Sequence, residues 1–466
     1  MPVKRPEKTP MPQRGAGLRA HDFGEVNEGY VRYHAVFEAE RCLRCQDPVC
    51  VEGCPVSIPI PEFIHEIVTG DMQEAARILR GANPLPAICG RVCPQESQCE
   101  ARCNVAIRFA PVAIGHLERY VADWERTQAR NGRVELTKPE RIAVIGSGPS
   151  GLVCAGQLAQ MGYAVTVYEA LHAPGGVLRY GIPEFRLPKE ILDWEIDGLR
   201  AMGVRFECNV IVGRTIALAD LTGRLGYSAV FIGTGAGLPQ FLGIPGEDLH
   251  GVLTANEFLT RVNLMRSYEF PASDTPVDVG KRVIVIGAGN TAMDAVRTAL
   301  RMGAQEASIV YRRSETEMTA RVEEYHHASE EGVRFRWLTS PLEILGDPGG
   351  NVIALRCRTM ELGEPDASGR RRPIPVPGSE HEIPVDTVIL ALGTTPNPLL
   401  TRTTAGLLTN EEGCIVADER TGRTSRDAVF AGGDAVTGAA TVILAAGAGK
   451  RAAHAIDEAL EARRAG

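Results

Sequence analysis

Two groups of cysteines carry the most specific chemistry in this sequence. Eight of the chain's 12 cysteines lie between positions 42 and 103, and each group contains a cysteine followed by proline. The groups are Cys42, Cys45, Cys50 and Cys54, and then Cys89, Cys93, Cys99 and Cys103. Thiolates are soft ligands that suit iron–sulfur clusters or zinc, and Cys-Pro is common in cluster-binding runs. The pattern therefore predicts iron–sulfur clusters, with zinc as the alternative.

Zinc and disulfides fit these cysteines less well than clusters do. Two four-cysteine zinc sites match the count, but the spacing lacks the paired C-x2-C knuckles of a zinc ribbon. The N-terminus is basic without the apolar core of a secretory signal, so we expect the reducing cytoplasm and no disulfides. The other cysteines are singletons, which we interpret as small buried apolar residues: Cys154, Cys208, Cys357 and Cys414.

A glycine-rich turn between a short strand and a helix indicates a first nucleotide-binding unit. The apolar run 142–145 leads into Gly146, Gly148 and Gly151. In a dinucleotide-binding fingerprint these glycines allow the tight turn, the approach of backbone to a pyrophosphate, and close packing of helix on strand. The helix N-terminus then faces the phosphates with its positive dipole end. The next predicted strand ends at Glu169, which is placed to hydrogen-bond a ribose hydroxyl.

Further glycines are predicted to close around the same nucleotide. Gly175 and Gly176 allow backbone to approach a cofactor, although an ordinary glycine turn is the alternative. An apolar run at 429–431 leads into Gly433 and Asp434, and a small-residue helix is expected at 440–453. A strand that ends in Gly-Asp against a helix N-terminus suits the ribityl and pyrophosphate groups of FAD.

The strand–glycine–helix–strand pattern occurs a second time, from position 282. Its third glycine is replaced by Ala292, which the fingerprint allows. Two arginines stand where the first unit has its acid, and arginine can pair with a 2′-phosphate that an acid repels. This unit is predicted to bind NADPH, with a solvated basic turn as the alternative for the arginines. The predicted contacts are Gly287, Gly289, Asn290, Thr291, Arg312 and Arg313.

Composition and charge exclude other classes of protein. The chain has 466 residues, of which 50 are Gly and 30 are Pro, and this favours a globular protein with many turns. Its net charge of -8 gives no electrostatic footprint for nucleic acid. No segment has the apolar length of a membrane span. A disulfide reductase flavoprotein is not predicted either, because no close cysteine pair follows Cys103.

The motifs resemble those of a known family. The chain is similar to the small subunit of NADPH-dependent glutamate synthase. It also resembles the large subunit of the bifurcating NADH-dependent ferredoxin:NADP oxidoreductase and the N-terminal half of dihydropyrimidine dehydrogenase. The resemblance covers nearly the whole chain from Asp22 onward. Its most specific marks are Cys42-x-x-Cys45, the runs 90–95, 180–183 and 289–294, Tyr311-Arg312-Arg313, and the run 432–434.

The resemblance implies a fold class and a set of cofactors. We expect an α/β protein with two Rossmann-like dinucleotide-binding domains of the glutathione/adrenodoxin reductase type and an N-terminal α-helical iron–sulfur domain. FAD is expected in the first Rossmann domain, NADPH in the second, and two [4Fe-4S] clusters in the helical domain. The expected ranges are 1–28 for an extended arm or partner contact, 29–135 for the helical domain, 136–255 and 395–466 for the FAD-binding domain, and 256–394 for the NADPH-binding domain.

The resemblance also implies an interleaved set of cluster ligands. One cluster takes Cys42, Cys45, Cys50 and Cys103. The other takes Cys54, Cys93, Cys99 and a non-cysteine ligand, whose motif position matches Glu118. A count of cysteines alone selects eight thiolate ligands, whereas the resemblance leaves Cys89 as a spare without a cluster. The alternative for Glu118 is that it is an ordinary surface carboxylate.

The implied activity is electron transfer from NADPH through FAD and the clusters to a partner. No catalytic side chain is expected, because the cofactors carry the chemistry. An amidotransferase nucleophile and a (β/α)8 pattern are missing, so we expect a hetero-oligomer in which a larger catalytic subunit holds the second substrate. The segment 362–366 with Arg370, Arg371 and Arg372 favours the glutamate synthase large chain, which converts glutamine and 2-oxoglutarate to glutamate. One alternative is the large subunit of an electron-bifurcating NADH-dependent ferredoxin:NADP oxidoreductase, with a ferredoxin-type reductase subunit as partner. The alternative from another class is a non-enzymatic zinc-bearing adaptor.

Overall fold

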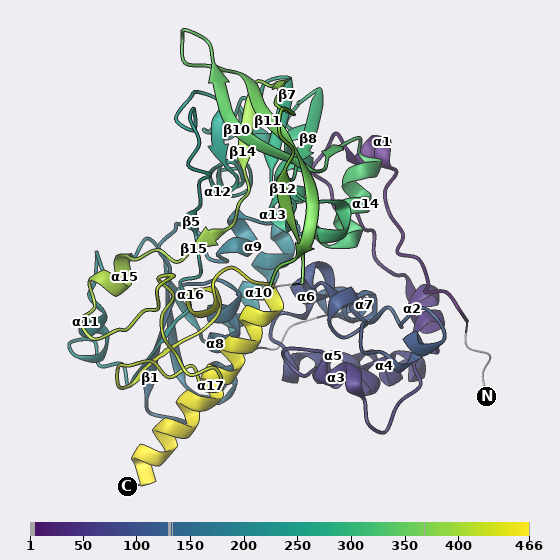
Figure 1. Ribbon diagram of the computed structural model, residues 1–466. Helices are drawn as coiled ribbons and strands as arrows, with labels where there is room; N and C mark the ends of the chain where they lie inside the picture. Colours follow the sequence, from purple (N-terminus) through teal and green to yellow (C-terminus); the bar gives the residue numbers. More distant parts are fainter. Residues whose placement is uncertain (1–4, 129–131, 133, 368, 466) are drawn as a thin grey trace.

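The computed structural model describes residues 5–128, 132, 134–367 and 369–465, which form a helical part and two parallel-sheet units (Figure 1). The helices of the first part are α1 (Ala16–Arg19), α2 (Arg32–Ala39), α3 (Val49–Glu52), α4 (Ile60–Thr69), α5 (Met72–Ala82), α6 (Pro86–Val92) and α7 (Ile114–Arg126). α4 buries Ile60, Phe63, Ile64 and Ile67, the spacing of a helix that packs by one face. α4 ends at a left-handed glycine, and the Asp71 carboxylate then caps α5.

The first unit contains a five-stranded parallel sheet with the order β16-β4-β1-β2-β3. Its strands are β1 (Arg141–Ile145), β2 (Ala164–Tyr168), β3 (Arg205–Glu207), β4 (Ala229–Ile232) and β16 (Val429–Ala431). Its helices are α8 (Pro149–Gln160), α9 (Val177–Tyr180), α10 (Lys189–Ala201), α11 (Leu218–Thr222), α15 (Leu399–Arg402), α16 (Asp434–Thr437) and α17 (Val442–Ala465). Because β16 pairs with β4 in parallel, the C-terminal region completes a sheet that begins 288 residues earlier, from 141 to 429.

The second unit repeats this architecture with the strand order β6-β14-β7-β8-β9. Its strands are β6 (Val252–Thr254), β7 (Arg282–Ile286), β8 (Glu306–Val310), β9 (Arg334–Arg336) and β14 (Thr387–Leu390). Its helices are α12 (Ala255–Leu259), α13 (Asn290–Arg301) and α14 (Val322–Glu330). β6 lies before the predicted boundary at residue 255, and yet it pairs with β14 of the second sheet.

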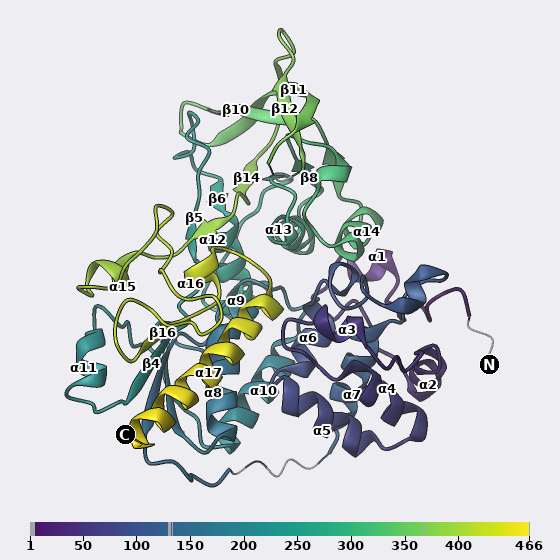
Figure 2. The ribbon, with the colours of Figure 1, turned by 60° about the horizontal axis from the view of Figure 1, so that its bottom comes forward.

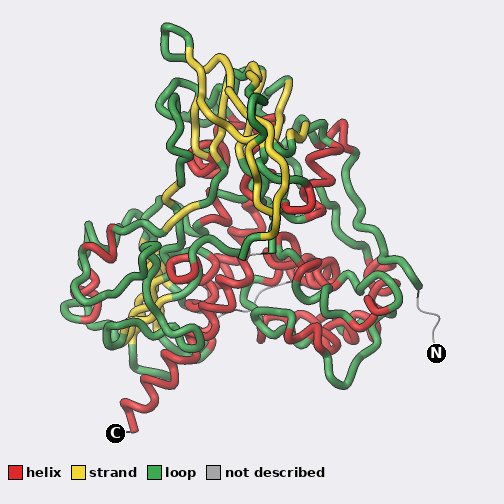
Figure 3. Tube along the Cα trace, in the orientation of Figure 1, coloured by secondary structure: helices red, strands yellow, loops and turns green. Residues whose placement is uncertain are grey.

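An antiparallel sheet that the sequence patterns did not predict rises from the second unit (Figure 3). It consists of β10 (Thr339–Gly346), β11 (Val352–Pro365), β12 (Arg371–Pro375) and β13 (His381–Pro384). Two short strands, β5 (Leu238–Pro239) and β15 (Thr394–Thr395), pair with each other where the chain crosses between the two units. The extra sheet places the tip of the β11–β12 hairpin beside the residues that follow β8.

The N-terminal arm, of which residues 5–28 are described, lies along both the helical part and the second unit (Figure 1). At one end, the backbone N–H of Thr9 donates to the buried Glu38 carboxylate at 2.7 Å. At the other end, Arg19 is only 2% exposed and pairs with Glu330 and Glu331 at the end of α14. The arm is therefore a packed part of the fold and not a loose extension.

Glu331 is shared by three buried guanidinium groups. Its carboxylate accepts from Arg297 at 2.7 Å and Arg301 at 2.8 Å, both on α13, and from Arg19 of the arm at 3.1 Å. The Arg297 and Arg301 groups also lie over the ring of Phe185, which belongs to the first unit. One carboxylate thus joins the arm to the second unit, next to an aromatic ring of the first.

Helix α17 lies against α8 of the first unit and reaches the helical part (Figure 2). Two glycines permit very close contact on its two sides. A Cβ atom at Gly449 would lie 2.1 Å from the carbonyl oxygen of Ser150 in α8, and one at Gly447 would lie 2.6 Å from that of Pro55. Because Pro55 directly follows Cys54, α17 packs between the glycine turn of the first unit and the segment of the helical part that carries Cys54.

The structure bears on two further predictions, the burial of the four lone cysteines and the absence of a membrane-spanning segment. Cys154, Cys357 and Cys414 are buried as predicted. Cys208 is only half-buried, because it follows the edge strand β3 at the surface of the sheet, so the prediction was wrong there. Among the described residues, no helix combines the length and apolarity needed to cross a membrane.

Candidate functional site

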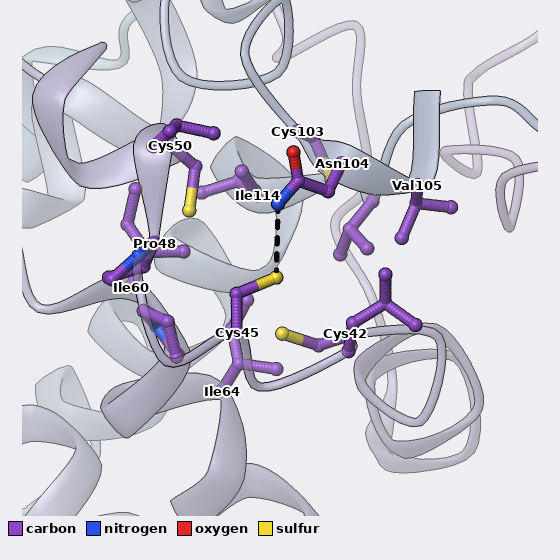
Figure 4. Close-up of a pocket in the computed structure, with 14 residues that line it drawn as sticks. Cys42, Cys45, Pro48, Cys50, Ile60, Ile64, Cys103, Asn104, Val105 and Ile114 are labelled. Carbon is purple, nitrogen blue, oxygen red and sulfur yellow. Dashed lines mark hydrogen bonds between the residues drawn. The ribbon is translucent and has the colours of Figure 1, made fainter. Parts of the chain in front are cut away.

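The first cysteine site is a pocket at the surface of the helical part (Figure 4). Its ligand candidates come from the loop after α2, from α3 and from the residue before the 3-10 turn Asn104–Ile107: they are Cys42, Cys45, Cys50 and Cys103. Apolar side chains, including Ile60 and Ile64 of α4, line the same pocket. The fold thus brings Cys103 to cysteines more than 50 positions earlier, in an apolar niche that suits a cluster.

The thiolates of this site repel one another. Burial, followed by the negative charges of Cys103, Cys42 and Cys45, raises the pKa of Cys50 to about 12. The positive charge of a bound metal group offsets such repulsion between thiolates. Asn104 donates from Nδ2 to Sγ of Cys45 at 3.4 Å, as Figure 4 shows. Hydrogen bonds to cluster sulfurs are one means by which a protein sets the reduction potential.

The second cysteine site is more deeply buried and contains Cys54, Cys93 and Cys99. Burial raises the pKa of Cys54 to about 11, and the charge of Glu118 adds to this shift. Burial also raises the pKa of Cys99, with contributions from Glu100, Cys54 and Glu118. The three thiols and the Glu118 carboxylate therefore lie close enough to interact.

Two residues compete to be the fourth ligand of this second site. The Glu118 side chain is buried, which raises its pKa to about 8, and its Oε1 accepts from Asn83 Nδ2 at 3.4 Å. The Cys89 thiol hydrogen-bonds to Cys93, and this contact, together with burial, raises the pKa of Cys93. Both residues face the same thiols, so the preference for Glu118 stays a prediction.

Within the ranges that the structure describes, no three His, Cys, Asp or Glu side chains converge closely enough to hold a single metal ion. Zinc needs ligand atoms about 2.0–2.3 Å from one point. A polynuclear cluster is larger and accepts thiolates that are further apart.

The glycines of the first unit have the geometry that a dinucleotide turn needs. Gly146 has a φ of 93°, and a Cβ atom there would lie 2.5 Å from the carbonyl oxygen of Gly233. A Cβ on Gly151 would lie 2.0 Å from the carbonyl oxygen of Gly146, so only glycine lets α8 pack this closely on β1. A Cβ on Gly148 would meet no atom within 4 Å. This open side lies at the N-cap of α8, where a pyrophosphate would bind.

The loop with Gly175 and Gly176 closes over the same turn, and two carboxylates lie near it. A Cβ on Gly176 would lie 2.7 Å from Cα of Gly148. Glu169 is buried and accepts the N–H groups of Ser147 and Leu171, and a carboxylate has capacity for a further donor. Oδ1 of Asp434, the first residue after Gly433, is buried without a partner among the described residues, and burial raises the pKa of Asp434 to about 6. A hydroxyl-bearing ligand such as FAD would satisfy this orphaned acceptor.

The second unit presents an equivalent turn. Gly287 has a φ of 133°, and its Cβ would lie 2.3 Å from the carbonyl oxygen of Ala391. Gly289 is the N-cap of α13, which begins at Asn290, and Thr291 is exposed beside it. Oδ1 of Asn290 accepts the backbone N–H of Arg321 at 2.9 Å. The turn is therefore braced by the segment that leads into α14.

The two arginines after β8 differ in environment. Arg312 is exposed, whereas Arg313 is buried and pairs with Asp366 of the β11–β12 hairpin at 2.7 Å. Arg313 also donates to the carbonyl oxygen of Arg371 at 2.9 Å. Arg312 is thus the better placed of the two to meet a 2′-phosphate, while Arg313 holds the hairpin against the nucleotide-binding sheet.

Comparison with protein families agrees with this division of the chain. Residues 19–130 match the 4Fe-4S cluster domain II of dihydropyrimidine dehydrogenase. Residues 113–222 and 140–459 match the pyridine nucleotide-disulphide oxidoreductase family. Among solved structures, Mycobacterium tuberculosis FprA in complex with NADPH is 25% identical, with a TM-score of 0.59 over 70% of this chain and 86% of that chain. The chain is therefore an NADPH-dependent oxidoreductase with an FAD- and NADPH-binding fold and an iron–sulfur domain.

Named sequence relatives define the family more closely. The glutamate synthase [NADPH] small chain of Halomonas elongata is 37% identical over 464 residues, covering 98% of this chain and 96% of that protein. The NADP(+)-dependent formate dehydrogenase subunit beta of Moorella thermoacetica is 39% identical over 436 residues, covering 88% of this chain and 60% of that protein. The chain belongs to the family of the glutamate synthase [NADPH] small chain.

Some residues near the sites were missed by sequence reasoning. Asn104 directly follows Cys103, so its proximity to a predicted ligand was a usable signal. Arg321 and Lys450 are far in sequence from the cysteine-bearing segments that they contact. Only the folded chain brings Arg321 to Gln95, at 3.0 Å, and Lys450 to Val56, at 2.7 Å.

Proposed function

We propose that this protein is the electron-input subunit of a glutamate synthase, which delivers reducing equivalents from NADPH to a larger catalytic subunit. The supporting observation is the contact through α17, which joins Ser150 of the first glycine turn to Pro55 beside Cys54. Bound FAD accepts a hydride from NADPH, and bound clusters carry single electrons. The names of the full-length relatives favour glutamate synthase as the assembly.

Each part of the chain has a binding role in this proposal. The first unit holds FAD through its glycine turn and Asp434, and the second holds NADPH through the turn at Gly287 and through Arg312. Two [4Fe-4S] clusters occupy the cysteine sites. Their ligands are Cys42, Cys45, Cys50 and Cys103 for the first cluster, and Cys54, Cys93, Cys99 and Glu118 for the second.

The cofactor content tests the first half of the proposal. The purified protein should be brown-yellow, with one FAD, about eight irons and matching sulfide. NADPH should bleach the flavin absorbance under anaerobic conditions. A colourless protein with stoichiometric zinc would contradict the proposal and favour an adaptor.

The partner is tested by reconstitution. An affinity-tagged chain should retain a glutamate synthase large chain from cell extract, and the purified pair should form glutamate from glutamine and 2-oxoglutarate only when NADPH is present. Recovery of a ferredoxin-type reductase subunit instead, with no glutamate formed, would show that the chain serves another assembly.

Two matched substitutions test the ligands of the second site. Cys89→Ser should leave the iron content unchanged, because Cys89 is the predicted spare. Glu118→Ala should lose or convert one cluster and change its paramagnetic resonance signal, while the Cys42 cluster remains. The opposite result would show that the second cluster has four thiolate ligands.

A further inference from the structure

Lys450 lies at the point where α17 meets the second cysteine site. Its ammonium group donates to the carbonyl oxygen of Val56 at 2.7 Å and to that of Ala82 at 2.8 Å. Val56 is two residues after Cys54, and the same helix packs on Pro55 through Gly447. Burial lowers the pKa of Lys450, and the negative charge of the Cys54 thiolate acts in the opposite direction. The Lys450 ammonium group and the Cys54 thiolate therefore attract each other.

The charge of Lys450 is not neutralised by an acid. In the part of the chain that the structure describes, Lys450 forms no ion pair with a carboxylate, and both of its hydrogen-bond partners are neutral carbonyls. The nearby Arg80 differs in this respect, because it pairs with Glu195 at 2.6 Å and with Glu125 at 2.9 Å. Lys450 is therefore a net positive charge at the edge of a buried site, where water screens charges weakly.

On this basis we propose that Lys450 is a positioning residue that raises the reduction potential of the cluster held by Cys54, Cys93 and Cys99. This inference rests on the proposed function. A reduced cluster carries one more negative charge than an oxidised one, so a fixed cation nearby favours the reduced state. The same helix touches the first glycine turn through Gly449, so the cation lies on the side from which electrons would arrive from FAD.

A purely structural role is the rival explanation. Ala82 is the last residue of α5, and its carbonyl is one of the acceptors that a helix C-terminus leaves unpaired. A cation there stabilises the helix whether or not a cluster is nearby. Only a measurement that responds to charge separately from folding distinguishes the two roles.

Redox titration of the purified holoprotein, followed by paramagnetic resonance, provides this measurement. Lys450→Gln removes the charge but keeps an amide donor, and Lys450→Arg keeps the charge. Lys138→Gln is the matched control, because Lys138 pairs with Glu461 at the other end of α17. Lys450→Gln should disfavour reduction of the second cluster on the order of tenfold, which is ~59 mV for one electron. The reduction potential of the first cluster should be unchanged in Lys450→Gln. Both cluster potentials should match the wild type in Lys450→Arg and in Lys138→Gln.

Iron content and thermal unfolding are measured on the same samples. Full iron content with an unchanged potential in Lys450→Gln would overturn the inference and leave only the structural role. If Lys450→Gln loses iron, the Lys450→Arg variant provides the test instead. A full cluster content with the wild-type reduction potential in Lys450→Arg supports the role of charge. A full cluster content with a lowered reduction potential overturns it. A wild-type protein without iron would instead overturn the proposed function.

Discussion

The two nucleotide-binding units contact the helical part in different ways. The first unit meets it through close backbone packing of Gly447 of α17 on Pro55, together with an ion pair between Glu195 of α10 and Arg80 of α5 at 2.6 Å. The second unit meets it through charged and polar groups: Arg321 donates to Gln95 at 3.0 Å and to Glu96 at 3.2 Å, while Arg19 of the arm reaches Glu331. The pyrophosphate turns of the two units are alike, but their attachments are not.

The difference follows from what each contact must do. In the proposed function, electrons pass from the first unit to a buried cysteine site, and small residues allow the close packing that such transfer requires. The second unit only has to present its nucleotide, and buried ion pairs fix its orientation through directional hydrogen bonds. We therefore expect the contact of α17 with Pro55 to be sensitive to side-chain volume, and the contacts of the second unit to be sensitive to charge.

The largest effect is expected from Glu331→Gln. This change leaves Arg19, Arg297 and Arg301 buried without their shared carboxylate, and breaking such a network costs about 3–5 kcal/mol. Chemical unfolding should show a loss of this size. Glu306→Gln is the control, because Glu306 forms an exposed pair with Arg334 that should contribute at most about 1 kcal/mol. Equal losses in both variants would show that the buried network contributes no more to stability than the exposed pair.

The same variant has a defined pH dependence. Burial by itself raises the pKa of Glu331, but hydrogen bonds from Arg297 and Arg301 outweigh it and lower the pKa to about 2. A lowered pKa stabilises the fold above the usual value of 4.5, and this contribution is lost as the pH falls towards 2. The difference in melting temperature between wild type and Glu331→Gln should be full at neutral pH and should shrink below pH 4.5.

A smaller effect is expected from Gly447→Ala on the volume-sensitive side. The added Cβ would lie 2.6 Å from a carbonyl oxygen, and overpacking of this kind costs about 1–3 kcal/mol. Gly81→Ala in α5 is the control, because its Cβ would meet no atom within 4 Å and should stabilise the helix by about 0.5–1 kcal/mol. Opposite signs in an unfolding titration are the predicted result, and a neutral Gly447→Ala would show that α17 can move away.

The smallest effect on the fold, but a specific one on binding, is expected from Arg312→Glu. An exposed arginine should not affect stability, whereas loss of a charge-assisted contact to the 2′-phosphate should cost about 1.5–3 kcal/mol, or roughly tenfold to a hundredfold. Stopped-flow reduction of the flavin should show preference moving from NADPH towards NADH. Arg334→Glu tests whether a negative charge elsewhere on the second unit suffices, and unchanged discrimination in Arg312→Glu would show that Arg312 is a bystander.

Local patterns predicted the nucleotide-binding architecture well. The strand predicted at 142–145 is β1, at Arg141–Ile145, and the second pattern, predicted from position 282, begins with β7 at Arg282–Ile286. Both are short apolar runs that end at a glycine turn, and such runs determine their own structure because each is buried on both faces of a parallel sheet. Family resemblance also predicted the fold class correctly, including the helical iron–sulfur domain.

Long-range contacts were beyond the reach of these patterns. The β10–β13 sheet was missed because its strands are partly exposed and irregular, with Pro341 at a break in the register between β10 and β11. The pairing of Arg313 with Asp366 depends on this sheet, so the sequence did not show that the two adjacent arginines differ. The grouping of Cys103 with Cys42 came from resemblance, since spacing alone does not say which distant cysteines share a pocket.

The position of β16 and α17 at the end of the chain has a consequence for biosynthesis. A ribosome that adds about 5–20 residues per second needs roughly 10–40 s to go from β4 to α17. During this interval the first sheet has an open edge at β4, and the face of α8 that later packs against α17 stays uncovered. The nascent chain would therefore need protection from aggregation, and FAD loading would follow the synthesis of β16 and α17, which come after the helical part and the second unit.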